Sequence, residues 1–489
     1  MTTAAAQGQP APGVIEYHHI DYIPKAERHG KVRDQFTLWF LANAELATLA
    51  VGFIGISLGL SLFWCLVAIV LGEIFGTFFM AFHAVQGPRM GIPQMLQSRP
   101  QFGFLGALIP QAIAVFLFVG FNIFNTIIGG TALATVTGLP LELSVVIMAV
   151  VAFALTMAGY DWIHFAQKWG TYIFLAVFGI FSLSVLLQGQ LPAEHSTTGE
   201  FQLTPFLVVL GAVASYQVSQ APYVSDFSRY LRPGSTSRAT FLWTYFGSAL
   251  GSFWMIALGA LLLALFPDAQ TVDSIVSGGD LLFAGFGTIT LAVALIGMVT
   301  VIALNMYSGH LSGLAAVDVV VRVKAGRGVR LVAVAIVGVL GTAGSLLLPE
   351  DFLASYGNFL FLILYFLTPW TAVNLVDYYL VRRGNYAILE IFKPHGIYGS
   401  WNWRGLVAYF VGFAAMIPFF SIALYTGPVA TALGGADLSV FVGLPVAALV
   451  YWILTRNLDM TEEQRLAAAE ASELEAAGEA AMHEAETSA

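Results

Sequence analysis

The sequence predicts an all-α membrane protein with twelve transmembrane helices. Only 10% of its 489 residues are charged and 58% are hydrophobic, whereas soluble domains are about 25% charged. Apolar runs of about 20 residues, the length that crosses a bilayer as a helix, recur along the whole chain. These runs lie at residues 36–60, 62–85, 104–134, 141–159, 165–189, 204–230, 239–266, 287–320, 331–348, 355–380, 403–424 and 438–456.

The twelve-span count also separates the charges. With the N-terminus placed in the cytoplasm, all 20 Lys and Arg residues fall in or beside cytoplasmic segments. The opposite loops hold acids such as Glu194, Asp268 and Glu350. Because membrane proteins keep Lys and Arg in their cytoplasmic loops, we expect both termini in the cytoplasm. We expect a plasma-membrane location, which in a bacterium is the inner membrane.

The two ends of the chain differ from the apolar body. Residues 1–33 are polar and lack the apolar core of a signal peptide, so we expect a cytoplasmic N-terminal tail. Residues 457–489 are rich in Ala and Glu and hold most of the excess acid behind the net charge of −9. Such a composition predicts a solvated tail that is partly helical or disordered.

Several classes of protein are excluded by residue usage. A single cysteine, Cys65, leaves no internal disulfide. The sequence holds no His/Cys/Asp spacing typical of a metal site and no nucleophile–base motif, so we expect neither an enzyme nor a cofactor. The lipid bilayer is the expected environment, and nothing indicates nucleic acid or an obligate protein partner.

Two of the runs are interrupted near their middle. The first carries an amide and a carboxylate within Ala42–Thr48, and an ionisable residue at bilayer depth costs at least about 2.5 kcal/mol unless it faces protein or water. The sixth is interrupted at Ala214–Pro222, where Pro222 lacks a backbone N–H. Matching interruptions in two halves of a chain indicate a transporter site built on inverted repeats. The alternative is two kinked helices whose polar residues bond to their neighbours.

Motifs near these interruptions resemble a known family. The chain is similar to the nucleobase–cation symporter family, in its purine/cytosine permease branch, over about residues 20–456. The segments that support the resemblance are Ala221-Pro222-Tyr223-Val224-Ser225-Asp226-Phe227-Ser228-Arg229-Tyr230-Leu231, Gly91-Ile92-Pro93-Gln94, Ser98-Arg99-Pro100-Gln101-Phe102-Gly103, Asn305-Met306-Tyr307-Ser308, and Pro369-Trp370 through Asp377-Tyr378-Tyr379-Leu380-Val381-Arg382-Arg383-Gly384.

The resemblance implies a LeuT-like fold. Its two inverted five-helix repeats would be residues 34–190 and 191–385, followed by two further helices in residues 386–456. It also implies secondary active uptake of a nucleobase, with cytosine or a purine expected, by cation symport through alternating access. Uracil, allantoin, a hydantoin or a vitamin-like ring are alternative substrates. An uncoupled facilitator or channel is an alternative mechanism.

In such a family the substrate lies between spans 1, 3, 6 and 8. Phe121 stands where the family commonly has a tryptophan that stacks on the ligand, and Gln220 replaces a second one, which leaves Tyr216 as another source of a ring. The amides of Asn125 and Asn305 match the donors and acceptors of a nucleobase edge. The further candidates are Ala47, Asn122, Gln217 and Ser219. Each polar candidate could instead join helices, an interaction worth about 0.6 kcal/mol.

The coupling ion is open between a proton and sodium. Sodium-coupled members bind Na⁺ between carbonyls of the span 1 break, here those of Asn43 and Leu46, and hydroxyls on span 8. Of the matching span 8 positions only Thr300 has a hydroxyl, because Val299 lacks one. The resemblance therefore favours a proton over sodium.

A proton-coupled carrier needs a group that can change its protonation inside the membrane. Glu45 and Glu73 lie deep, with no Lys or Arg at their depth, and apolar surroundings favour the neutral form of a carboxyl group. We expect Glu45 to take this role because it lies in the break. Its alternative role is structural, as an acceptor for freed backbone N–H groups. Asp226 and Arg229 are expected to form an inner-gate ion pair or a solvated pair at a helix end.

Overall fold

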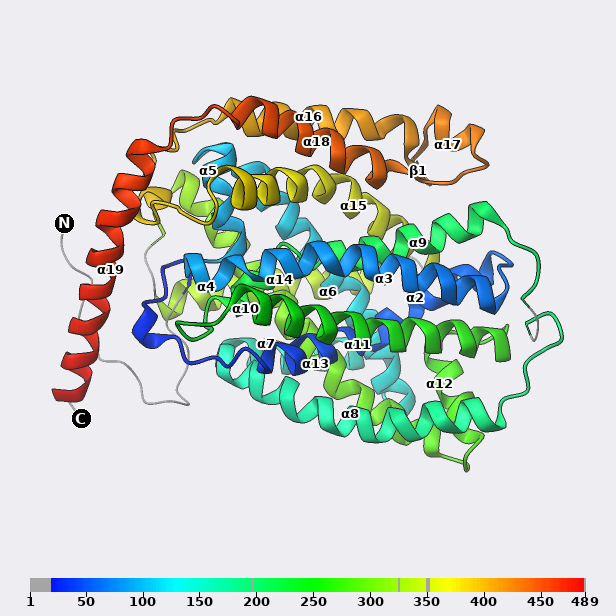
Figure 1. Ribbon diagram of the computed structural model, residues 1–489. Coiled ribbons are helices and arrows are strands. Elements are labelled where there is room, and N and C mark those ends of the chain that lie inside the picture. The colour runs from blue at the N-terminus through cyan, green and yellow to red at the C-terminus, as the bar shows by residue number, and fades with distance from the viewer. Residues whose placement is uncertain (1–18, 196–197, 324–325, 349–351, 488–489) are drawn as a thin grey trace.

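The computed structural model describes residues 19–195, 198–323, 326–348 and 352–487, and it is built almost entirely of helices that run along one common direction (Figure 1). Within these residues, eight helices are long and apolar enough to cross a membrane, and the bent pair α1–α2 makes a ninth span. Three shorter apolar helices bring the number to the twelve that the sequence predicts. The all-α, multi-span architecture is confirmed.

The spans follow the predicted runs closely. In chain order they are α1 (Asp34–Asn43) with α2 (Leu46–Ser57), α3 (Leu62–Ala84) continued by α4 (Gln86–Met90), α6 (Leu108–Thr137), α7 (Leu141–Ala158), α8 (Tyr160–Gln188), α9 (Leu203–Val218) with α10 (Val224–Ser228), α11 (Ser237–Leu265), α13 (Phe286–Val320), α14 (Arg327–Leu347), α15 (Phe352–Val376) extended by η3 (Asp377–Val381), α16 (Trp403–Met416) with η5 (Ile417–Phe419), and α18 (Ser439–Thr455).

Short elements connect the spans at both ends of the bundle. These are η1 (Lys25–Glu27), η2 (Gln94–Ser98), α5 (Arg99–Phe102), α12 (Thr271–Asp280), η4 (Leu389–Phe392), the hairpin of β1 (Ser421–Ile422) and β2 (Tyr425–Thr426), and α17 (Pro428–Ala432). A last helix, α19 (Thr461–Thr487), follows the twelfth span and crosses one end of the bundle (Figure 1).

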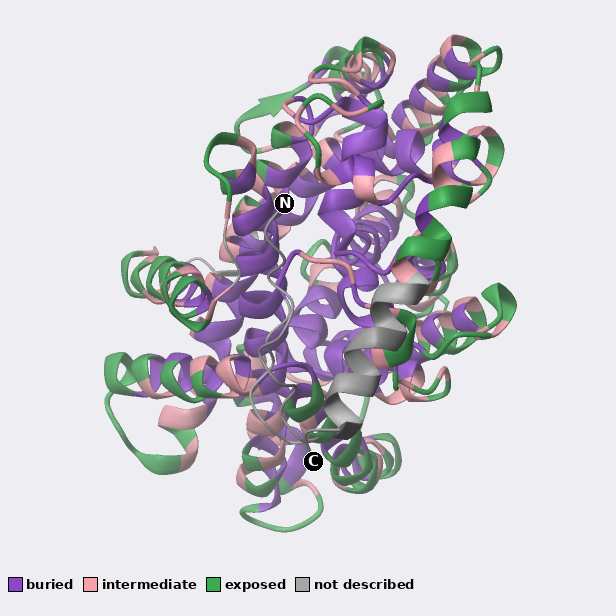
Figure 2. Ribbon diagram, turned by 90° about the vertical axis from the view of Figure 1, so that its left-hand side faces the viewer, coloured by how far each residue is buried: buried purple, intermediate pink, exposed green. Residues whose placement is uncertain are grey.

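The outside of the bundle is apolar. Peripheral helices bury one face and expose the other (Figure 2), and the exposed side chains include Leu187, Val339 and Leu449. A monomeric soluble protein does not expose such a continuous apolar belt around its surface, because large apolar patches drive association in water. The belt is the surface that lipid covers.

The first span lies unusually close to the seventh. A Cβ atom on Gly52 would lie 2.0 Å from the carbonyl oxygen of Ile256, and one on Gly259 would lie 2.0 Å from that of Leu49. Glycine at both positions lets the two backbones touch, the packing typical of helices in lipid. This contact fixes α2 against α11 beside the break in the first span.

The break in the first span covers Ala44 and Glu45. α1 ends at Asn43, and Glu45 is fully extended, with φ −142° and ψ 171°. The Glu45 side chain then accepts bonds from the N–H groups of Ala47 and Thr48 and so caps α2. An N-terminal cap satisfies donors that the helix itself leaves free. The two helices meet at an angle of 54°, within the interruption that the sequence predicts.

The break in the sixth span covers Ser219 to Tyr223. α9 ends at Val218, and the next N–H groups make tighter turn bonds, such as Ala221 N to the Val218 oxygen at 3.0 Å. Pro222 contributes no N–H, so the helix cannot continue through it. Both predicted interruptions therefore exist as breaks of the helix.

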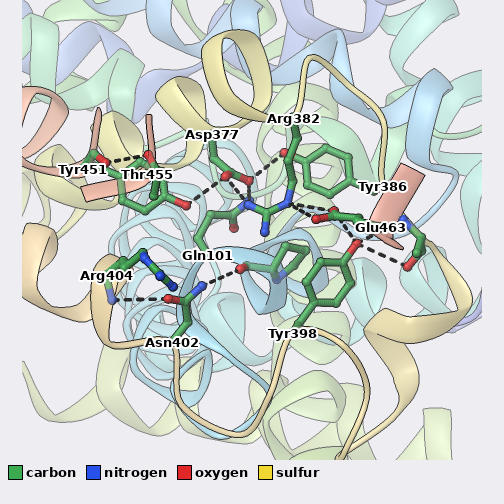
Figure 3. Close-up of polar contacts among 12 residues, drawn as sticks. Gln101, Asp377, Arg382, Tyr386, Tyr398, Asn402, Arg404, Tyr451, Thr455 and Glu463 are labelled. Atoms are coloured by element: carbon green, nitrogen blue, oxygen red, sulfur yellow. Dashed lines mark hydrogen bonds and ion pairs between the residues drawn. The ribbon is translucent and has the colours of Figure 1, made fainter. Parts of the chain in front are cut away.

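The C-terminal tail is helical and its first turns are docked. Arg382 lies between Asp377 and Glu463 (Figure 3), and its Nε donates to both carboxylate oxygens of Glu463, at 2.8 and 3.1 Å. The hydroxyl of Tyr398 donates to Glu463 over 2.8 Å. Farther along α19, Glu470 accepts from a backbone N–H of η4. Glu463 and Glu470 are buried, so the expectation of a solvated tail is wrong for these two acids.

Candidate substrate site

A small cavity lies where the two breaks face each other. Its volume is about 10 Å³, room for about one water molecule. It is enclosed by side chains of spans 1, 3, 6 and 8, which are Ala42, Glu45, Phe121, Asn125, Tyr216, Gln220, Tyr223, Val301 and Asn305. The four spans are those that the family resemblance implies.

Most of the predicted substrate residues meet at this cavity. Phe121, Asn125, Tyr216, Gln220 and Asn305 line it, and so does Glu45. Tyr223, Ala42 and Val301 also line the cavity, although the sequence did not predict a substrate role for any of them. The Ala-Pro-Tyr motif already contains Tyr223, so only its direction into the cavity was missing.

Other predicted substrate residues point elsewhere. Asn122 packs against α14, where a Cβ atom on Gly341 would lie 2.8 Å from the Cβ atom of Asn122. Gln217 turns toward Glu73, and Ser219 donates to the Tyr216 carbonyl at 2.6 Å. Ala47 is buried and contributes its N–H to Glu45. None of these four is among the residues that line the cavity.

Aromatic rings form two walls of the cavity. The ring of Phe121 stands nearly perpendicular to that of Tyr216, with centroids 6.3 Å apart and an angle of 83°. Phe359 meets Phe121 edge-on from behind, at 5.3 Å and 88°, which holds its position. Tyr223 packs against Trp39 at 5.4 Å. These rings offer apolar faces for a planar ligand.

Two amides of the cavity have polar atoms without a partner. Among the described residues, the Oδ1 of Asn125 and the Nδ2 of Asn305 are buried and make no hydrogen bond. One is an acceptor and the other a donor. Buried polar groups are normally paired, so these two are the atoms that a ligand edge with a donor and an acceptor would satisfy.

Gln220 is held by a reciprocal amide pair. Asn43 donates to the Gln220 Oε1 at 3.1 Å, and Gln220 donates back to the Asn43 Oδ1 at 2.5 Å. Asn43 also donates to the hydroxyl of Ser248 on α11, at 3.1 Å. The side chain of Asn43 therefore ties spans 1, 6 and 7 together.

Glu45 is surrounded by donors. Its oxygens accept from the N–H groups of Ala47 and Thr48 at 2.7 and 2.9 Å and from the Thr48 hydroxyl at 2.7 Å. The Tyr216 hydroxyl lies 3.5 Å away. Donors on both oxygens stabilise the ionised form of a carboxyl group. This geometry favours the structural role that the sequence left open for Glu45.

The predicted sodium ligands belong to span 8 and to the break in span 1. The hydroxyl of Thr300 donates to the Gly297 carbonyl at 2.8 Å. Gly297 faces the break, since a Cβ on it would lie 3.6 Å from the Ala44 oxygen. Asn43 ends α1 and Leu46 begins α2, so the two residues expected to supply carbonyl ligands flank the break. The structure thus places Gly297, whose carbonyl accepts from the Thr300 hydroxyl, opposite the break.

The predicted gate residues are both buried. The guanidinium of Arg229 donates to the carbonyl oxygen of Asp226 at 3.2 Å and to that of His19 at 2.9 Å. The Asp226 carboxylate accepts from the Gln94 N–H at 2.8 Å. Burial rules out the solvated pair. The two residues join span 6 to the segments before span 1 and after span 2.

Comparison with known proteins identifies the family. A family model described as permease for cytosine/purines, uracil, thiamine, allantoin matches residues 22–443. The chain belongs to this permease family. It is thus a membrane transporter rather than an enzyme, as the sequence predicts.

Curated relatives agree with this assignment. The chain is 39% identical over 445 residues to the putative purine-cytosine permease YxlA of Bacillus subtilis, covering 90% of this chain and 96% of the relative. It is 25% identical to the purine-cytosine permease fcyB of Emericella nidulans, over 90% and 88% of the two chains.

Solved structures support the fold. Mhp1, a nucleobase-cation-symport-1 family transporter, matches in a closed conformation with bromovinylhydantoin bound, with TM-score 0.73, 20% identity and coverage of 94% and 99%. Its inward-facing conformation gives TM-score 0.70 at 19% identity, with coverage of 94% and 98%. The LeuT-like fold is confirmed by this likeness, together with the two breaks.

Proposed function

We propose that this protein is a secondary active transporter that imports a nucleobase, cytosine or a purine, together with a cation. The observation that supports it most is the pair of unpartnered amide atoms, Asn125 Oδ1 and Asn305 Nδ2, in a cavity whose wall also holds the rings of Phe121 and Tyr216. A donor and an acceptor between apolar faces suit the edge and the faces of a heterocyclic base. The names of the relatives support the same substrate class.

The size of the cavity supports alternating access. A space of about 10 Å³ cannot hold a heterocycle, whereas ligand pockets typically have about 300 Å³ or more. Binding therefore requires the helices or side chains around the breaks to move. A proton is preferred to sodium because, of the span 8 positions that match the family's sodium ligands, only Thr300 has a hydroxyl. We place the protein in the plasma membrane with both termini in the cytoplasm, on the distribution of Lys and Arg.

The substrate is tested by ligand-induced thermal stabilisation of the purified protein. Cytosine, adenine, guanine, hypoxanthine, uracil, allantoin and a hydantoin are compared, each with and without Na⁺. We expect cytosine or a purine to raise the midpoint of thermal unfolding most, by the same amount with and without Na⁺. A larger shift with uracil, allantoin or a hydantoin would favour the alternative substrates, and a shift that requires Na⁺ would contradict proton coupling.

The mechanism is tested by counterflow in vesicles. An alternating-access carrier loaded with unlabelled substrate accumulates labelled substrate transiently, whereas an open channel does not. A pH gradient should also drive net accumulation. Equilibration without counterflow would favour the channel, and counterflow without gradient-driven accumulation would favour the uncoupled facilitator.

A further inference from the structure

A second buried carboxyl group lies outside the substrate cavity. Glu73 is in the middle of α3, is 3% exposed, and faces α9 and α11. Its Oε2 accepts from the Gln217 amide at 2.8 Å and from the Thr77 hydroxyl at 3.3 Å. Among the described residues its Oε1 makes no hydrogen bond, and no Lys or Arg lies within 4.0 Å of the carboxylate.

The two deep acids are therefore in different environments. Four donor groups surround Glu45, and two of them are backbone N–H groups that cannot leave. Glu73 meets only side-chain donors, those of Gln217, Thr77 and Ser252, and in the described structure its Oε1 has no partner. A buried charge without a cation costs far more than a buried neutral group, for which one unpaired polar atom costs about 1–3 kcal/mol. The surroundings of Glu73 suit a carboxyl group that is neutral for part of the transport cycle.

An unbroken chain of side chains joins Glu73 to the substrate cavity. Gln217 donates to Glu73, and its own Oε1 accepts from the Ser248 hydroxyl at 2.8 Å. Ser248 in turn accepts from Asn43, which is paired with Gln220 in the cavity wall. Every link is buried. The chain crosses spans 2, 6, 7 and 1.

We infer that Glu73 is the site that binds and releases the coupling proton, and that the chain Gln217–Ser248–Asn43–Gln220 transmits its state to the substrate. This inference rests on the proposed function, because it assigns the proton of that symport to one residue. It leaves Glu45 the structural role of capping α2 at the break. One proton is taken up from outside with each substrate and is released to the cytoplasm.

The hydrogen-bonded side chains can respond to a single proton because the donor-to-acceptor direction of their hydrogen bonds depends on the protonation state of Glu73. An ionised carboxylate only accepts, so Gln217 must present its NH₂ group to it and its oxygen to Ser248. A protonated Glu73 can donate to the Gln217 oxygen instead, which reverses the amide and then the donor order toward Gln220. The substrate edge therefore meets a different arrangement of donors in each protonation state.

The other titratable groups near Glu73 are few. Across the contact with α11 the nearest is Tyr245, which interacts with Glu73 electrostatically. On α9 it is Tyr216, next to Gln217, and the Tyr216 hydroxyl lies 3.5 Å from the carboxyl group of Glu45, the residue that precedes α2. Each of these hydroxyl groups ordinarily remains protonated at neutral pH. Glu45 is engaged by the two backbone N–H groups that it caps, so Glu73 is the carboxyl group to which we assign the exchange of the proton.

The test uses the full-length protein in vesicles with a trapped pH indicator. In wild-type vesicles, addition of cytosine or a purine should carry protons inward, and a one-unit pH gradient should support up to about tenfold accumulation. Glu73→Gln should keep counterflow but lose both proton entry and accumulation. Thr77→Val is the matched control, because it removes a donor to Glu73 and leaves the acid, and it should keep proton entry.

Each outcome separates the two proposals. If wild-type vesicles take up none of the heterocycles, the proposed function fails. If they take up substrate with sodium but no proton, or if Glu73→Gln still carries protons as the wild type does, the assignment of Glu73 is wrong and the substrate proposal stands.

A second measurement serves in case Glu73→Gln does not fold. Substrate binding to the wild type in weakly buffered solution should change the number of bound protons. The infrared difference spectrum should show the carbonyl band of a protonated carboxylic acid, shifted in Glu73→Asp. Absence of proton uptake or release on binding, or a band unchanged in Glu73→Asp, overturns the assignment.

Discussion

Asn305 offers the sharpest test of the substrate site, because its role in binding and its effect on stability have opposite signs. Its Nδ2 is buried in the cavity wall without a partner among the described residues. A buried unsatisfied donor costs about 1–3 kcal/mol of stability. Asn305→Leu keeps nearly the same size and removes that donor. We therefore expect the variant to be more stable than the wild type when no ligand is present.

The same variant should bind substrate poorly. The heterocycle loses a hydrogen bond and leaves its own acceptor unpaired, a loss of about 1–3 kcal/mol. Because each 1.4 kcal/mol is a factor of ten, affinity should fall about 5- to 140-fold. Thermal unfolding with and without cytosine measures both effects in one experiment, and binding of labelled substrate gives the affinity directly.

Asn122→Leu is the matched control. Both side-chain polar atoms of Asn122 are also buried without a partner in the described structure, but the residue faces α14 rather than the cavity. The Asn122→Leu variant should be more stable than the wild type and should keep the wild-type affinity for substrate. The reasoning is refuted if Asn305→Leu unfolds at a lower temperature without ligand and still shows the full substrate-induced shift, or if both variants lose affinity equally.

Further predictions concern the break, the helix contact and the docked tail. Glu45→Gln replaces an acceptor that binds backbone N–H groups and should lower the unfolding temperature, while any remaining uptake stays coupled to protons; wild-type stability would contradict its capping role. Gly52→Ala places a methyl group 2.0 Å from a carbonyl oxygen of α11 and should cost about 1–3 kcal/mol, measurable by thermal unfolding; no loss would mean that the two helices separate readily. Arg382→Met leaves two buried acids without their cation and should free α19 at a cost of about 3–5 kcal/mol, visible as faster hydrogen exchange in that helix, whereas unchanged exchange would mean that apolar contacts hold it. Burial raises the pKa of Glu463 although Arg382 opposes this, so docking of α19 should be strongest at acidic pH and weaken as pH rises through that raised pKa. Hydrogen exchange in α19, corrected for the intrinsic exchange rate, should show this pH dependence in the wild type and lose it in Glu463→Gln. Docking that becomes stronger as pH rises would refute the predicted direction.

The sequence alone determined the spans and the two breaks. Hydropathy and helix length are local properties, since a segment of about 20 apolar residues must satisfy its backbone within itself in lipid. Pro222 and the polar residues around Glu45 mark where a helix stops, for the same local reason. The family motifs added the residue types of the cavity, which is why Asn125, Asn305 and Phe121 could be named before any coordinates.

Only the tertiary structure decided which side chains face the cavity and which acids are paired. Asn122 and Asn125 are three residues apart on one helix, yet Asn122 faces α14 and Asn125 lines the cavity. Each face of a helix in a bundle could pack against several different apolar helices. Residue spacing alone therefore does not predict which neighbour a given side chain faces. Glu45 and Glu73 look alike as isolated carboxylates in apolar runs. Their difference comes from the number of donors that other helices, and the broken backbone itself, bring to each oxygen.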